Sequence, residues 1–215
     1  MDAVLMIDGG FLKKKYKQEF RKHLEAADLE TLSRKLIEKA TGRKAEEITY
    51  RAYYYDCPPY GEKEEIPLSG GQEMDFGQGS AYGKLAGFLS EVKLLPYFAV
   101  REGFLSFEGW SLKQKSFNNK TGPVSVTSDD FKVSLKQKGV DTKIGLDIAW
   151  VSYERIASRI ILVTGDSDFT PAVKTARRNG IFVTLFSLHH GIKPNLKENV
   201  DVHFSDNLKI LSAAS

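Results

Sequence analysis

An apolar run at 160–163 leads through a threonine and a glycine into a pair of aspartates, Asp166 and Asp168. A short, uninterrupted apolar run bounded by turn residues is typical of a β-strand that is buried on both faces. The periodicity that follows predicts a helix at 169–179, with Pro171 in its first turn, where a missing N–H costs nothing. Both aspartates should therefore lie where a parallel strand ends and a helix begins, which is where open α/β sheets bind ligands.

Two interpretations of this aspartate pair are open. Carboxylate oxygens are hard ligands that suit Mg²⁺ or Mn²⁺, and the N-terminus of a helix favours phosphate oxygens. The simpler interpretation is that one aspartate caps the following helix. A cap requires a single aspartate, so a pair spaced two residues apart favours a functional site.

A second apolar run, at 3–7, ends at Asp8 and two glycines. Taken alone, Asp8 is also explained as a turn residue that accepts hydrogen bonds from nearby backbone N–H groups. The carboxyl ends of parallel strands reach the same edge of a sheet, so Asp8 is expected near Asp166 and Asp168.

A helix is predicted from Lys138 to about residue 158. At 100° per residue, Asp141 and Asp147 fall on the two borders of its apolar stripe, so both can lean towards the sheet. Asp141 is also well placed for a helix N-cap. Asp147 lies in mid-helix, where an unpaired carboxylate is costly, so it requires a cation or a hydrogen-bonded partner.

The rest of the chain alternates between helices and strands. Helices are expected at 11–23, at 28–40 with Asp28 as N-cap, and at 83–95; strands are expected at 48–56, at 181–186 and around 202–204. This alternation places the 215-residue chain in the α/β class, as a single domain whose parallel sheet is covered by helices on both faces.

The region 57–137 interrupts this pattern. Residues 57–79 are rich in proline and glycine and predict a long loop that could cover the edge bearing the aspartates. Residues 97–115 predict an antiparallel hairpin, with one or two further strands up to 137. Its lysines and aromatic residues suit either a nucleic-acid surface or a hairpin protected against edge pairing: Lys113, Lys115, Lys120, Lys132, Lys136, Lys138, Phe104, Phe107, Trp110 and Phe117.

Composition narrows the class of protein further. The net charge of +3 is compatible with a polyanionic partner, and a lysine-rich helix at 11–23 is interpreted as a solvated face. Cys57 is the single cysteine, so an intrachain disulfide is impossible and a structural zinc site is not expected. His189 and His190 are interpreted as exposed loop residues. No segment has the length of a membrane helix and no signal peptide is evident, so we expect a cytoplasmic protein.

Three segments together resemble the NYN domain, a PIN-like ribonuclease fold, and within it the LabA-like bacterial branch. They are Ile7-Asp8-Gly9, Lys138-Gly139-Val140-Asp141 with Asp147, and Thr164-Gly165-Asp166-Ser167-Asp168-Phe169. The resemblance covers residues 3–56 and 138–205. It implies a three-layer, Rossmann-like sheet whose acids gather around Mg²⁺ or Mn²⁺ and hydrolyse RNA, with single-stranded RNA the expected partner.

The resemblance also implies roles for individual residues. The metal ligands would be Asp8, Asp141, Asp166 and Asp168; these four and Asp147 would be catalytic; and Ser167, Lys138 and Lys143 would contact the substrate. Many relatives carry an asparagine three residues after the first acid, where this chain has Phe11.

Two other functions are compatible with the sequence. A regulatory or RNA-binding protein could keep the fold without turnover. Phe11 and the insertion at about 57–137, which lies outside the resemblance, suggest this function. Gly165-Asp166-Ser167 also resembles a motif of haloacid-dehalogenase-type phosphatases. That chemistry requires a second aspartate two residues after the nucleophile. The nucleophile would here be Asp8, and the residue two positions later is Gly10.

Overall fold

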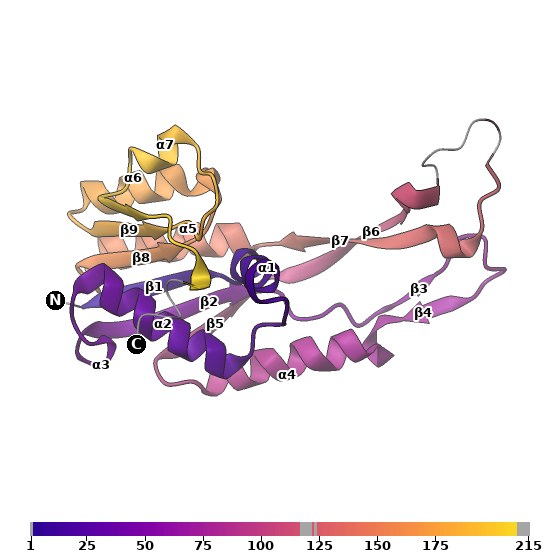
Figure 1. Cartoon of the computed structure of the whole chain (residues 1–215), viewed down its shortest axis with the longest axis horizontal. Coiled ribbons are helices and arrows are strands. Elements are labelled where there is room, and N and C mark those ends of the chain that lie inside the picture. The colour runs from indigo at the N-terminus through magenta and orange to yellow at the C-terminus, as the bar shows by residue number, and fades with distance from the viewer. Residues whose placement is uncertain (1, 117–121, 123, 210–215) are drawn as a thin grey trace.

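The computed structural model describes residues 2–116, 122 and 124–209 (Figure 1). Its centre is a six-stranded sheet in the order β10-β9-β8-β1-β2-β5, in which every neighbouring pair is parallel. The strands are β1 (Ala3–Asp8), β2 (Thr49–Asp56), β5 (Phe98–Glu102), β8 (Arg159–Val163), β9 (Phe182–Phe186) and β10 (Val202–Phe204). The predicted α/β class is thus confirmed.

Helices cover both faces of the sheet. Alternate residues of β1 enter opposite cores: Leu5 and Ile7 pack on one face, Val4 and Met6 on the other. The first face is covered by α1 (Gly9–Phe20), α2 (Ala26–Thr41) and α4 (Ser80–Leu94), the second by α5 (Val140–Tyr153) and α6 (Thr170–Arg178). Short helices are α3 (Ala45–Ile48), α7 (Pro194–Lys197), η1 (Phe76–Gln78), η2 (Gln114–Ser116), η3 (Ser128–Asp130) and η4 (Ser167–Phe169).

The starts of several helices differ from those predicted, and three of the differences concern an aspartate. Helix α1 begins at Gly9, directly after the strand, because the Asp8 carboxylate accepts the N–H of Phe11 and caps it. Helix α2 has Glu25 as N-cap; Asp28 lies three residues further on and accepts the N–H of Glu25, so the predicted cap is wrong. Helix α5 is preceded by a left-handed residue, Gly139, so Asp141 is not its cap.

The predicted hairpin at 97–115 is wrong. Its first half is β5, which joins the main sheet parallel to β2 after the crossover through α4. Its second half is β6 (Phe104–Leu112), which pairs antiparallel with β7 (Phe131–Lys138). Apolar alternation shows that a segment is a strand but does not identify its partner, which explains the error.

The predicted loop at 57–79 contains a second, shorter hairpin, β3 (Lys63–Glu65) with β4 (Glu73–Asp75). The two hairpins extend away from the sheet as one arm, so the 57–79 segment does not lie over the carboxyl ends of the strands (Figure 1). Contacts among four rings join the hairpins: Tyr60, Phe76, Phe107 and Trp110. We refer to β3, β4, β6 and β7 as the arm.

Some predicted features lie outside the described residues. They include Phe117 and Lys120, and the side chain of Lys115 is likewise not described. Within the described ranges, no helix is long and apolar enough to cross a membrane.

Gly103 connects β5 to the arm in a space that has no room for a side chain. A Cβ at this position would lie 2.4 Å from the carbonyl oxygen of Lys138 and 2.8 Å from Cγ2 of Val140. Because backbone would have to move, we expect Gly103→Ala to lower the free energy of unfolding by about 1–3 kcal/mol in urea titrations. Gly87→Ala, in α4 with open space around it, is the control and should not destabilise. Equal stability of the two variants would contradict this account.

Candidate active site

The carboxyl ends of β1 and β8 are joined through a buried threonine. Thr164 directly follows β8, and its hydroxyl donates to Asp8 Oδ2 at 3.2 Å. The same hydroxyl oxygen accepts the backbone N–H of Asp166 at 3.1 Å. The prediction that Asp8 and Asp166 lie at one edge of the sheet therefore holds, and Thr164 is the link between them. We call this the carboxyl edge.

The segment after β8 turns through η4 into α6. The carboxylate of Asp166 accepts the N–H of Asp168 at 2.9 Å, so Asp166 does cap the turn, as the simpler interpretation proposed. Asp168 itself is exposed. The hydroxyl of Ser167 accepts the N–H of Lys193 at 3.4 Å, which ties the α7 loop to this turn.

Burial and like charges act together on these acids. Burial is the main cause of a raised pKa at Asp8, and it outweighs the hydrogen bonds from Phe11 and Thr164, which act in the opposite direction. The charges of Asp141 and Asp166 raise that pKa further. The pKa of Asp141 is raised as well, first by burial and then by the charges of Asp166 and Asp168. Acids from β1, α5 and the β8–α6 turn therefore interact electrostatically.

These acids do not form a ready-made ligand set for a metal ion. Among the residues that the structure describes, no three His, Cys, Asp or Glu side chains are grouped so that they could hold one. The metal centre implied by the resemblance thus stays a prediction. The chemistry of the donors suits a hard divalent cation, and the raised pKa values of Asp8 and Asp141 show that burial and like charges disfavour their ionised forms.

The carboxylate of Asp147 has partners of its own. Its Oδ2 accepts the Tyr55 hydroxyl at 2.9 Å and pairs with Arg101 Nε at 3.0 Å. The need for a partner, inferred from its mid-helix position, is confirmed. Of the two predicted substrate lysines, Lys143 is exposed near the start of α5, and Lys138 pairs with Glu108 at 3.3 Å.

Phe11 and His190 close over Gly165. The two rings meet edge to face, with centroids 5.7 Å apart. A Cβ on Gly165 would lie 2.3 Å from His190 Cδ2 and 2.7 Å from Phe11 Cε2, so a larger residue would require these rings to move. His190 is exposed, as predicted, yet sequence reasoning did not place it beside Asp166; the signal available was its position after β9.

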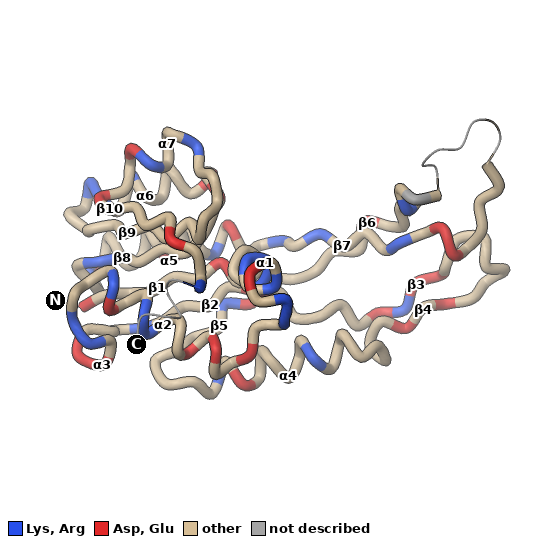
Figure 2. The backbone as a smooth tube through the Cα atoms, in the orientation of Figure 1, with Lys and Arg blue, Asp and Glu red and all other residues tan. Residues whose placement is uncertain are grey.

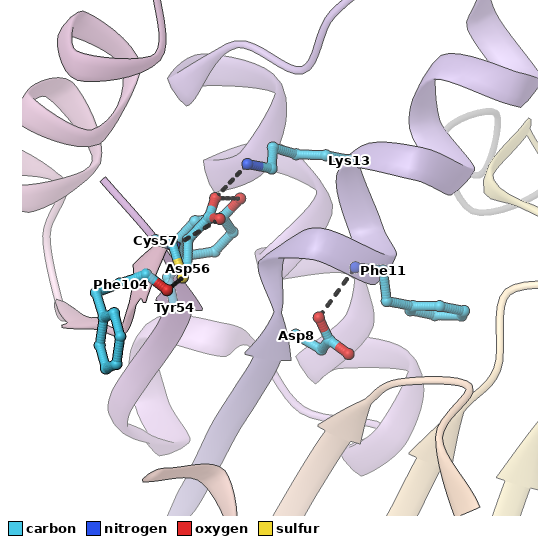
Figure 3. Close-up of polar contacts among 7 residues, drawn as sticks. All are labelled: Asp8, Phe11, Lys13, Tyr54, Asp56, Cys57 and Phe104. Carbon is cyan, nitrogen blue, oxygen red and sulfur yellow. Dashed lines mark hydrogen bonds and ion pairs between the residues drawn. The ribbon is translucent and has the colours of Figure 1, made fainter. Parts of the chain in front are cut away.

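A further buried acid at this edge was missed. Asp56 ends β2 and is only 2% exposed. Its Oδ2 pairs with Lys13 Nζ at 2.6 Å and accepts the Tyr54 hydroxyl at 3.2 Å, while its Oδ1 accepts the N–H of Cys57 (Figure 3). Its place at the end of a strand was the available sequence signal, and the Lys13 pair binds α1 to β2 beside Asp8.

Cys57 is unsuited to nucleophilic chemistry. It is 2% exposed, its thiol donates to the carbonyl oxygen of Phe104 at 3.3 Å, and burial raises the pKa of that thiol (Figure 3). A thiol must ionise to attack, so its burial and its raised pKa make Cys57 a poor nucleophile.

The raised pKa of Asp8 has a consequence for stability. The unfolded chain ionises this carboxyl near the ordinary aspartate value of about 3.9, while the folded chain keeps its proton to higher pH. The free energy of unfolding therefore falls as pH rises from that value through the folded pKa. We expect the stability of Asp8→Asn relative to wild type to increase over the same window in urea titrations. A difference that does not change with pH, or that decreases, would contradict this expectation.

Comparison with known proteins identifies the family. The model of the NYN domain matches residues 79–210, more than half of the chain. The matched range contains Asp141, Asp147, Asp166 and Asp168, and Asp8 precedes it.

The individual proteins that resemble this chain share only part of its sequence. An uncharacterized protein from Sinorhizobium fredii, y4oD, is 31% identical over 83 residues, which span 34% of this chain and 39% of that protein. A Vibrio parahaemolyticus protein of unknown function, VPA0982, is 14% identical with a TM-score of 0.48, and the alignment covers 94% and 90% of the two chains. A chain described as "The Structural basis for Sirtuin Substrate affinity" is 10% identical with a TM-score of 0.41, over 98% and 90%. Because neither TM-score reaches 0.5, the family rests on the domain match: the chain belongs to the NYN domain family.

Proposed function

We propose that this protein is a divalent-metal-dependent ribonuclease that hydrolyses single-stranded RNA at the carboxyl edge, in the PIN-like, LabA-like part of its family. Membership of the NYN family supports a ribonuclease-type function in general. The observation that carries the proposal is that Thr164 joins Asp8 to Asp166 at this edge, where the charges of Asp141 and Asp166 help to raise the pKa of the buried Asp8.

The proposed ligands of the ion are Asp8, Asp141, Asp166 and Asp168, the acids that interact electrostatically. Mg²⁺ or Mn²⁺ suits their oxygen atoms, and a cation would offset the repulsion that contributes to the raised pKa values of Asp8 and Asp141. When bound, such an ion lowers the pKa of a coordinated water and offsets negative charge on the phosphate oxygens.

The protein's own groups orient the acids and the RNA. Thr164 fixes the Asp8 carboxylate relative to the backbone of Asp166 through its two hydrogen bonds. Lys143 is exposed near the start of α5, two residues after Asp141, and its charge can attract a phosphate. Fixing the acids before the substrate arrives lowers the cost of assembling the reactive geometry.

Two observations favour a second candidate, an NYN protein that binds RNA without cutting it. Phe11 occupies the position where many relatives have an amide, and its ring packs on His190 instead. Asp166 already serves as the cap of η4. In this alternative the acids would keep the fold of the edge without supporting turnover.

Incubation of end-labelled single-stranded RNA with the protein tests the proposal. Cleavage is expected with Mn²⁺ or Mg²⁺, is abolished by EDTA and returns when Mn²⁺ is added in excess. RNA binding in EDTA without cleavage in either ion would support the second candidate. Cleavage that is insensitive to EDTA would contradict the metal-dependent mechanism.

A further inference from the structure

The two faces of the β6–β7 hairpin have different chemistry. In an antiparallel pair, residues directly opposite one another share a face, and alternate residues along each strand do so too. The ladder therefore puts Phe107 with Leu135 and Trp110 with Val133 on one face. That face packs towards Tyr60 and Phe76, which flank the shorter hairpin, so Phe107 and Trp110 hold the arm together and are not exposed for stacking on bases.

The opposite face of the hairpin is basic. It carries Lys132, Lys136 and Lys138, opposite Ser111, Ser106 and Phe104 respectively. Lys132 and Lys136 are exposed and take part in none of the ion pairs between described residues. One acid, Glu108, lies in the bulge of β6 and pairs with Lys138, so the face keeps a net positive charge. We call these residues the lysine face, and Figure 2 shows lysines along β7.

The strand that carries the lysine face leads to the carboxyl edge. Strand β7 ends at Lys138, and α5, with Asp141 in its first turn, begins two residues later. Gln137 projects from the other face of β7, and its side-chain oxygen is 3.1 Å from the position that a Cβ on Gly10 would take. The end of β7 therefore lies against the start of α1 beside Asp8. From Lys132 to Lys138 the strand extends about 20 Å at roughly 3.3 Å per residue.

One aromatic side chain remains available on this face. Phe104 is 60% exposed and lies opposite Lys138, at the end of the hairpin nearest the sheet. An exposed ring beside basic groups is what single-stranded nucleic acid binds, because a base can stack on a ring only when it is unpaired.

We propose that the lysine face, with Phe104 at its inner end, is a track that holds the backbone of single-stranded RNA and leads it to the carboxyl edge. The proposal rests on the proposed function in taking RNA as the ligand, and it adds the surface that holds the RNA outside the site. It also requires a substrate that extends beyond the reacting phosphate by several nucleotides.

Binding in EDTA tests the track independently of cleavage. Fluorescence polarisation would follow an unstructured RNA of about 24 nucleotides and one of about 6 nucleotides. The double variant Lys132→Gln/Lys136→Gln is expected to bind the long RNA about tenfold more weakly and to reduce the slope of log affinity against log salt by about 1.4. Phe104→Ala is expected to weaken it about fivefold or more without changing that slope.

The matched control is Lys44→Gln/Lys174→Gln, which removes two exposed lysines outside the arm, one preceding α3 and one in α6. It should bind the long RNA within about twofold of wild type. Three results would overturn the track: equal binding by the two double variants, equal losses for long and short RNA, or a preference for duplex over single strand. None of these depends on turnover, so failure of Mn²⁺-dependent cleavage would count against the nuclease and leave this result intact.

Discussion

Asp166→Asn is expected to slow RNA cleavage by about a hundredfold or more. The substitution removes a negative charge from the proposed ligand set, and a metal ion at such a site contributes several kcal/mol to the stability of the transition state. Asparagine keeps an oxygen that can accept the N–H of Asp168, so η4 should still form. Single-turnover rates with Mn²⁺, with circular dichroism to verify folding, give the result.

Asp2→Asn is the matched control for this variant. Asp2 is exposed and precedes β1, at the end of the strand opposite Asp8, so its loss should leave the rate unchanged. RNA binding in EDTA should persist in Asp166→Asn, because the lysine face is intact. Equal cleavage rates for Asp166→Asn and wild type would eliminate Asp166 from the mechanism.

Lys13→Met is expected to lower the free energy of unfolding by about 2–4 kcal/mol. The substitution leaves the Asp56 carboxylate buried with its two hydrogen bonds but without its counter-charge, and removing one partner of a buried pair is strongly destabilising. The lower part of that range reflects the 31% exposure of the Lys13 side chain, through which water reaches the site. Urea titration at neutral pH measures the loss.

Two further variants isolate the effect of the charge. Lys14→Met removes the neighbouring, exposed lysine and should change stability by no more than about 0.5 kcal/mol. Asn in place of Asp56 removes the buried charge, so Lys13→Met/Asp56→Asn should recover part of the stability lost in the single lysine variant. If Lys13→Met proved as stable as Lys14→Met, the ion pair between Lys13 and Asp56 would not be important for stability.

The sheet and the meeting of Asp8 with Asp166 could be predicted from sequence because both depend on local patterns. The apolar runs before these acids mark buried strands, and parallel strands deliver their carboxyl ends to one edge. The same logic predicted α5 and the need of Asp147 for a partner. Nothing local identified that partner: Tyr55 lies 92 residues away and Arg101 lies 46 residues away in the chain.

The wrong or missing predictions also concern which strand or which charged group a segment pairs with. Residues 97–115 alternate as two strands would, yet Gly103 separates a strand of the main sheet from a strand of the arm. The aromatic residues of the arm looked available to bases, but the ladder turns Phe107 and Trp110 towards the second hairpin and leaves Phe104 exposed. Asp56 was missed because its counter-charge, Lys13, comes from another element.

A calorimetric titration of the protein with Mn²⁺ tests most directly whether acids from separate segments share one divalent ion. Wild-type protein is expected to bind Mn²⁺ saturably. Asp8→Asn and Asp141→Asn, from β1 and α5, should each weaken binding by about tenfold or more, whereas Asp2→Asn should bind as wild type does. Absence of saturable binding, or affinity that neither Asp8→Asn nor Asp141→Asn changes, would contradict the shared site.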